Sequence, residues 1–144
     1  MKRAAITRLL SLLAFLVLCV PIVLGDWTGS TDGGSGTWKD TGLSGKKTGT
    51  NSATVTVTTT TTVNATYTAV VTYKIGTVTM VGGKPQFNQI ASFNRNLGVG
   101  ANQEVTNDFQ GLARGVEYTV KVSFVWNPGG LEADPPDRTI TVAP

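Results

Sequence analysis

The chain has 144 residues, a length that suits one domain, with 12 lysine and arginine residues against 9 aspartate and glutamate residues. It contains no histidine and one cysteine. This composition removes the commonest general base and metal ligand, the Ser–His and Cys–His nucleophile systems, and a structural zinc site built from Cys and His. We therefore expect a non-catalytic protein that needs no cofactor.

The first 25 residues have the pattern of a secretory signal peptide. Three basic residues precede an apolar run from Leu9 to Leu24, which ends at the small residue Gly25. The alternative is an uncleaved membrane anchor, but the run is shorter than the roughly 20 residues that span a bilayer and Pro21 interrupts it. We predict cleavage before Asp26, a secreted or cell-surface location (extracellular or periplasmic), and no stable membrane span after cleavage.

Removal of the signal changes the charge balance. Residues 1–25 hold three basic residues, no acidic residue and the only cysteine, Cys19, so the mature chain has nine basic and nine acidic residues. A net charge of zero does not suggest the basic face that nucleic acids require, so we expect no nucleic-acid partner. Since the mature chain can form no disulfide, its stability depends on a hydrophobic core.

Residues 26–51 are rich in glycine, threonine and serine and poor in apolar residues. This composition is typical of a flexible leader. Trp38 and Leu43 are the residues that could fix part of the leader to the folded domain as a first strand. Trp27 is the better candidate for contact with a carbohydrate or a partner protein.

A strict alternation runs from Thr54 to Gly76. The odd positions are largely apolar and the even positions are nearly all threonine. Because successive side chains of a strand point to opposite faces, this pattern predicts strands with one buried and one solvated face, rather than a proline-rich mucin-like stalk. The run is too long for one strand, so we expect a break near Val63–Asn64. The apolar phase changes after Gly76, which predicts a bulge or turn there.

The remaining segments also predict short strands separated by turns. Val78 and Met80 carry the apolar phase after Gly76, residues 80–87 contain a Gly-Gly turn, and residues 87–96 have the pattern of a short edge strand. Further strands are expected near residues 103–109, 116–126 and 138–143. About seven strands over residues 52–144 predict an all-β, antiparallel β-sandwich domain.

The segment Leu112–Val122 resembles the E–F corner of fibronectin type III domains. Leu112, Gly115 and Tyr118 fall on that family's pattern, followed by alternating apolar residues. In the family the tyrosine hydroxyl bonds back to the backbone near the leucine, a tyrosine corner that immunoglobulin-like sandwiches share. The resemblance implies an immunoglobulin-like sandwich but no particular function, because this fold hosts many functions.

The loop from Asn127 to Asp137 is the predicted site of any binding, because loops at the ends of a sandwich usually carry recognition. Trp126 borders this loop and has two interpretations: an aromatic platform for a sugar or partner, or a buried residue that caps the core. Leu131 is the lone large apolar residue of the loop and a candidate anchor, together with Trp27.

Three acidic residues of this loop, Glu132, Asp134 and Asp137, raise the question of a metal site. Calcium takes six to eight oxygen ligands, and the spacing of these three matches no calcium-loop pattern. A carboxylate pair for glycoside hydrolysis needs a concave site with a fixed separation, which a mobile loop does not supply. We expect a solvated acidic loop and no metal.

The sequence thus predicts a secreted, non-catalytic β-sandwich module with a structural or binding role at the cell surface. Its expected partner is a protein or glycan of the cell envelope. The alternatives are a carbohydrate-binding accessory module and a subunit of a surface fibre.

Overall fold

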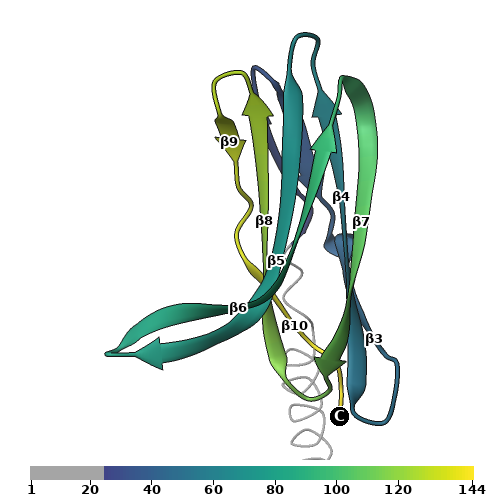
Figure 1. Cartoon of the computed structure of the whole chain (residues 1–144), viewed down its shortest axis with the longest axis vertical. Helices are drawn as coiled ribbons and strands as arrows, with labels where there is room; N and C mark the ends of the chain where they lie inside the picture. The colour runs from purple at the N-terminus through teal and green to yellow at the C-terminus, as the bar shows by residue number, and fades with distance from the viewer. Residues whose placement is uncertain (1–24) are drawn as a thin grey trace, which may run out of the picture.

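The computed structural model describes residues 25–144 (Figure 1). The predicted signal peptide, apart from Gly25, lies outside the described residues. In chain order the elements are β1 (Trp27–Thr31), β2 (Gly34–Trp38), the 3-10 turn η1 (Asp40–Gly42), β3 (Leu43–Lys47), β4 (Ser52–Val63), β5 (Thr68–Val81), β6 (Lys84–Leu97), β7 (Gly100–Ala113), β8 (Glu117–Asn127), β9 (Leu131–Ala133) and β10 (Arg138–Thr141). None of residues 25–144 belongs to a helix long and apolar enough to cross a bilayer.

The strands form two antiparallel sheets that enclose one core. In the first sheet, β4 lies at the centre, with β7 on one side and β2 and β3 on the other, and β1 pairs with β2. In the second sheet, β5 and β8 are central, β6 flanks β5, and β9 and β10 flank β8. The predicted all-β sandwich is confirmed: residues 52–144 form seven strands, as expected, and three further strands precede them.

The threonine-rich run forms two strands, as its alternation predicts. β4 ends at Val63 and β5 begins at Thr68, which confirms the predicted break. Odd residues of β4 point into the core, including the buried Thr59 and Thr61. The even threonines from residue 56 onward are partly exposed on the outer face, where Thr56 donates to Asp108 of β7 at 2.6 Å.

The N-terminal segment is not a flexible leader, and the predicted boundary at residue 52 is wrong. Residues 27–47 contribute β1, β2 and β3 to the first sheet. Trp38 is buried in the core, and its indole N–H donates to the Gly42 carbonyl at 3.0 Å. The expectation that Trp38 and Leu43 fix part of this segment as a strand is therefore correct, but the ordered part is much larger.

The glycines of this segment make room for aromatic rings. A Cβ on Gly36 would lie 2.8 Å from the Phe124 ring, and one on Gly33 would lie 2.4 Å from Trp126. Trp27 stacks on Phe124 with ring centroids 5.9 Å apart, and Phe124 stacks on Trp126 at 6.0 Å. The low apolar content of the segment thus reflects close packing against large side chains of the opposite sheet.

The turn between β7 and β8 has the contact expected of a tyrosine corner. The Ala113 N–H donates to the Tyr118 hydroxyl at 2.8 Å, and both Leu112 and Tyr118 are buried. Gly115 has a φ of +76°, a left-handed conformation that favours glycine, and its N–H donates to the Val142 carbonyl at 2.7 Å. The corner therefore ties the β7–β8 turn to the C-terminal segment.

The hairpin of β5 and β6 extends beyond the sandwich. The β5–β8 pairing ends at Gly76. The outer part of the β5–β6 hairpin bends away from the second sheet and projects to the side (Figure 1). The pairing shifts register between Ile75 and Gly76, and Ile90 is the extra residue of this bulge on β6. The predicted irregularity at Gly76 is confirmed, but Val78 and Met80 lie on the projecting part and not in the core.

Candidate functional site

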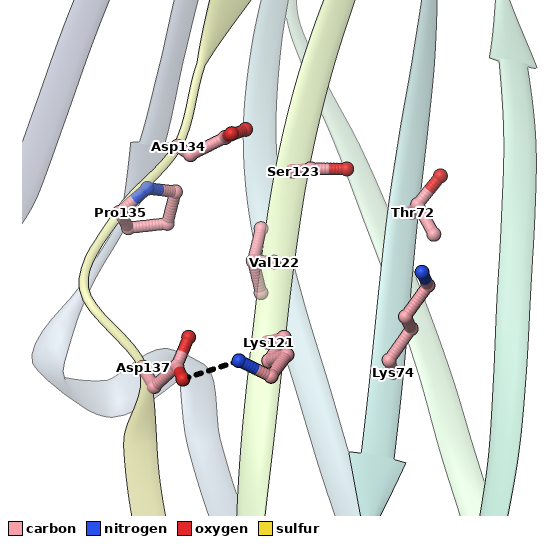
Figure 2. Close-up of a pocket in the computed structure, with 8 residues that line it drawn as sticks. All are labelled: Thr72, Lys74, Lys121, Val122, Ser123, Asp134, Pro135 and Asp137. Carbon is pink, nitrogen blue, oxygen red and sulfur yellow. Dashed lines mark hydrogen bonds and ion pairs between the residues drawn. The ribbon is translucent and has the colours of Figure 1, made fainter. Parts of the chain in front are cut away.

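The outer face of the second sheet carries a groove between β5, β8 and the segment that joins β9 to β10. Figure 2 shows the residues that line it. They are Thr72, Lys74, Lys121, Val122, Ser123, Asp134, Pro135 and Asp137, and they enclose a hollow of about 220 Å³.

Strand register brings the polar residues of the groove together. Thr72 pairs with Ser123, and Lys74 pairs with Lys121, across the β5–β8 ladder. Between them, Tyr73 and Val122 point the other way, into the core. Alternation of side chains along both strands therefore places two hydroxyls and two ammonium groups on one outer surface.

Both signs of charge meet in the groove. Lys121 Nζ lies 2.7 Å from Asp137 Oδ2, and this ion pair contributes about 0–1 kcal/mol because both side chains are substantially exposed. Within residues 25–144, neither Lys74 nor Asp134 forms an ion pair. The groove thus presents one unpaired cation and one unpaired anion to a ligand.

The groove has the chemistry of a recognition surface for polar groups. It offers hydroxyl, ammonium and carboxylate groups, and the Thr72 hydroxyl is already bound to Asn94 Oδ1 at 2.8 Å. Among the described residues, no group of three or more His, Cys, Asp or Glu side chains could hold a metal ion. Glu132, Asp134 and Asp137 accordingly do not converge on one point.

The projecting part of the β5–β6 hairpin, residues 77–88, is called the arm below. Its register pairs Val78 with Phe87 and Met80 with Pro85, so these four residues share one face. Val78 and Met80 are 46% and 66% exposed. The other face is mostly polar, and there Asn88 Nδ2 donates to the Thr79 hydroxyl at 3.0 Å.

Gly76 and Phe87 join the arm to the groove. A Cβ on Gly76 would lie only 2.1 Å from the Asn88 carbonyl oxygen, so the sharp bend of the hairpin requires glycine here. The Lys121 ammonium group lies over the Phe87 ring, 4.9 Å from its centroid. Because Lys121 also lines the groove, the apolar face of the arm and the polar groove form one surface, which we call the corner surface.

The three aromatic and apolar residues predicted to bind a partner lie elsewhere. Trp126 is fully buried and its indole N–H donates to the Thr62 carbonyl, so the interpretation as an exposed platform is wrong and the capping interpretation is right. Trp27 and Leu131 are half-buried and pack against the core. Trp27 borders a second hollow of about 110 Å³ with Asp26, Pro136, Asp137 and Arg138.

The predicted binding loop, residues 127–137, is partly a strand. β9 pairs with β8, with Leu131 opposite Trp126 and Ala133 opposite Phe124. Its last part then borders the groove through Asp134, Pro135 and Asp137. The loop does contribute to the candidate site, but through its second half and not through Leu131.

Sequence reasoning missed the arm and the two lysines of the groove. The phase change after Gly76 was the available signal for the arm, because it moves Val78 and Met80 onto the face that Lys74 occupies. Lys74 and Lys121 were visible only as solvent-facing members of two strands. Nothing in the linear sequence shows that these two residues are neighbours across a ladder.

No family model matches this sequence, and none of the curated proteins shows significant similarity to it. Among solved structures, the crystal structure of a Bifidobacterium adolescentis GH3 beta-glucosidase is similar over 70% of this chain, with 19% sequence identity and a TM-score of 0.41. The matched part is 16% of the beta-glucosidase chain. A similarity of this extent shows neither a shared family nor a shared activity.

Proposed function

We propose that this chain is a secreted, non-catalytic module with an immunoglobulin-like, fibronectin type III-like sandwich, which binds a protein or glycan of the cell envelope through the corner surface. The observation that carries this proposal is the contact between Phe87 and Lys121, which joins an exposed apolar face to a groove with unpaired charges. Binding surfaces typically combine an apolar part with polar groups that fix orientation.

A non-catalytic role is supported by the composition and by the groove. The chain has no histidine, and its only cysteine lies in the predicted signal peptide. Among the described residues, no basic group forms a hydrogen bond with the Ser123 hydroxyl in the groove. The Asp137 carboxylate is paired with Lys121. A nucleophile–base pair of the kind that covalent catalysis needs is therefore not found at this surface.

A carbohydrate-binding module is the second candidate. The hydroxyl of Thr72 and the amide of Asn94 form a polar pair beside the groove, and such groups can bind sugar hydroxyls. The tryptophans offer less support, since Trp38 and Trp126 are buried and Trp27 stacks on Phe124. A glycan array tests this candidate, and selective binding of one glycan class would favour it over a protein partner.

A subunit of a surface fibre is the third candidate. Among the described strands, β6 and β7 have no further neighbour on their outer edges. Free edges can pair with strands of another chain. If the chain is a fibre subunit, its copies should form assemblies of increasing size. Binding through the corner surface, by contrast, involves a single partner molecule.

The test compares a groove variant with a matched control on the other sheet. Ser123→Lys places a long charged side chain in the groove, and Thr58→Lys places the same side chain on the outer face of β4, where Thr58 contacts Thr106. We expect Ser123→Lys to weaken binding to the native cell envelope about tenfold or more, and Thr58→Lys to bind like wild type. A chelator should have no effect on wild-type binding.

Equal binding by both folded variants would contradict the proposed surface, as would loss of wild-type binding on addition of the chelator. Folding of each variant is checked by its thermal unfolding curve. Both sites lie on exposed faces of strands, so both variants are expected to fold.

A further inference from the structure

The groove contains two like charges, of which the chain itself neutralises only one. Lys74 of β5 and Lys121 of β8 are directly opposite each other on antiparallel strands. Like charges in this arrangement repel each other. Asp137 lies 2.7 Å from the Lys121 ammonium group, whereas Lys74 is exposed and forms no ion pair with any residue from 25 to 144. The Lys74 ammonium group is therefore the point in the groove that favours an external anion.

A second donor lies beside this ammonium group. Figure 2 shows the Lys74 side chain running along β5 toward Thr72, with the Ser123 hydroxyl of β8 turned toward the same space. The Thr72 hydroxyl already donates to Asn94 Oδ1 at 2.8 Å, which leaves the Lys74 ammonium group and the Ser123 hydroxyl as donors. Such a pair suits the two oxygens of a carboxylate, because hydrogen bonds with ionised partners are stronger than those between neutral groups.

Asp134 sets a second condition for the ligand. Its carboxylate forms no ion pair within the described part of the chain, and Figure 2 shows it directed toward Ser123. An ionised carboxylate only accepts hydrogen bonds, so Asp134 repels an anion but binds a donor. The ligand therefore needs a hydrogen-bond donor close to its anionic group. The hollow of about 220 Å³ is smaller than the roughly 300–1,000 Å³ of sites for drug-sized ligands, so both groups belong to one small unit.

A sugar acid meets both conditions, whereas an acidic side chain meets only one. A uronic acid carries its carboxylate and several hydroxyl groups on one ring, and each hydroxyl is a donor. The side chain of aspartate or glutamate, when ionised, has no donor of its own. The chemistry of the groove thus favours a glycan over a protein as the source of the anion.

We propose that the groove binds one carboxylate-bearing sugar unit of an acidic glycan. The sugar carboxylate binds the Lys74 ammonium group and the Ser123 hydroxyl, and a ring hydroxyl of the same unit donates to Asp134. This inference rests on the proposed function, because it names the chemical class of the envelope ligand that occupies the groove. Recognition through charge needs no exposed tryptophan, which agrees with the burial of Trp38 and Trp126.

The experiment is an NMR titration of the isotope-labelled mature chain with two matched probes, methyl glucuronide and methyl glucoside. The two sugars differ only at the carbon outside the ring, which is a carboxylate in the first and a hydroxymethyl group in the second. We expect the glucuronide to shift the amide signals of residues 72–74, 121–123 and 134–137, and to bind about tenfold or more tightly than the glucoside. This preference should decrease as salt is added, because Lys74 is exposed.

Three variants test the two conditions separately. Lys74→Gln and Lys46→Gln each remove one positive charge, the first from the groove and the second from β3 in the first sheet. Lys74→Gln should lose the preference for the glucuronide, and Lys46→Gln should keep it. Asp134→Ala should bind acetate, an anion without a donor, more tightly than wild type does, while the ratio of the glucuronide affinity to the acetate affinity falls. All three positions are exposed, so the variants should keep the wild-type thermal unfolding midpoint.

Three results would overturn the inference. The first is a glucuronide that binds no more tightly than the glucoside, or that shifts only signals outside the groove. The second is an unchanged preference in Lys74→Gln. The third is N-acetylglutamate amide that binds the groove as tightly as the glucuronide, which would mean that a protein supplies the anion.

The proposed function stands or fails separately. Ser123→Lys fills the hollow and places its ammonium group beside Asp134, so it should weaken envelope binding whatever the ligand is. If this variant loses envelope binding but the glucuronide does not bind to wild type, the inference fails and the proposed function stands. If the glucuronide binds in the groove but the envelope is not bound, the proposed function fails.

Discussion

Two buried polar residues hold the two sheets in place. The Tyr73 hydroxyl of β5 donates to the Val105 carbonyl of β7 at 2.8 Å and binds the Thr59 hydroxyl of β4 at 2.6 Å. Arg138 of β10 donates to the carbonyls of Lys39, Trp38 and Gly25 and lies over the Trp38 ring. Burial lowers the pKa of the Arg138 guanidinium, although Asp40 and Asp26 raise it in part.

The Tyr73→Phe variant tests the first of these contacts. It keeps the ring but leaves the Thr59 hydroxyl and the Val105 carbonyl without their partner, so the free energy of unfolding should fall by about 1–3 kcal/mol. Urea denaturation at neutral pH measures this loss. Tyr67→Phe, which removes the hydroxyl of a half-buried tyrosine, is the control, and an equal effect of both variants would argue against a special role for Tyr73.

The same residue predicts a dependence of stability on alkaline pH. Burial raises the pKa of Tyr73 to about 12, although the hydrogen bond to Thr59 lowers it in part. Between about pH 10 and 12, tyrosine ionises in the unfolded chain but not in the folded one, so the stabilising contribution present below pH 10 is lost over this range. The loss is on the order of 2–3 kcal/mol. The difference in stability between wild type and Tyr73→Phe should therefore shrink as the pH rises from 10 to 12.

The Tyr118→Phe variant tests the tyrosine corner. It leaves the Ala113 N–H without its 2.8 Å acceptor, so we expect a loss of about 1–3 kcal/mol in the free energy of unfolding. The readout is again the denaturation midpoint. A midpoint equal to that of wild type would show that the hydroxyl contributes nothing at this corner.

At the scale of elements, the alternation of residues predicted most of the strands. Residues 54–76 and 116–126 alternate strictly because each strand there has one buried face, and β4, β5 and β8 follow that pattern. The strands in residues 26–51 were not predicted because, apart from Trp38, the buried positions of this segment are glycines, such as Gly36 beneath Phe124. The sequence alone does not distinguish a glycine that makes room for a packed ring from a glycine of a flexible segment.

This correction predicts that residues 52–144 do not form an independent domain. Without β1, β2 and β3, β4 loses its pairing on one side, and the fragment also lacks Trp38 and the carbonyls of Lys39 and Trp38 that accept from Arg138. We expect the fragment to lack the cooperative unfolding transition of the 26–144 chain, as measured by circular dichroism during heating. A fragment with the full-length midpoint would restore the interpretation of residues 26–51 as a leader.

At the scale of the whole molecule, the candidate site could be predicted only in part. The loop at residues 127–137 does border the groove, through Asp134, Pro135 and Asp137, and its role in binding stays a prediction. The corner surface itself depends on which strands are neighbours and on the direction in which the hairpin bends. Both are properties of the folded chain, because a single sequence does not show that Phe87 meets Lys121.

Secretion is a prediction about the whole chain that is independent of the site. We expect the secreted protein to begin at Asp26, because the basic start, the apolar run and Gly25 fit a cleaved signal. N-terminal sequencing of protein recovered from the culture medium or periplasm measures this. A membrane-retained chain that begins at Met1 would mean that the segment is an anchor.

The central claim is that the corner surface is where this module binds the envelope, and amide hydrogen exchange tests it most directly. The mature chain is compared, at one concentration, free and bound to native envelope. The account predicts slower exchange on binding in the arm, residues 77–88, and in residues 134–137 beside the groove, with no change on the outer face of the first sheet around Thr106–Asp108. Slower exchange confined to the first sheet, or no change in the arm, would contradict it.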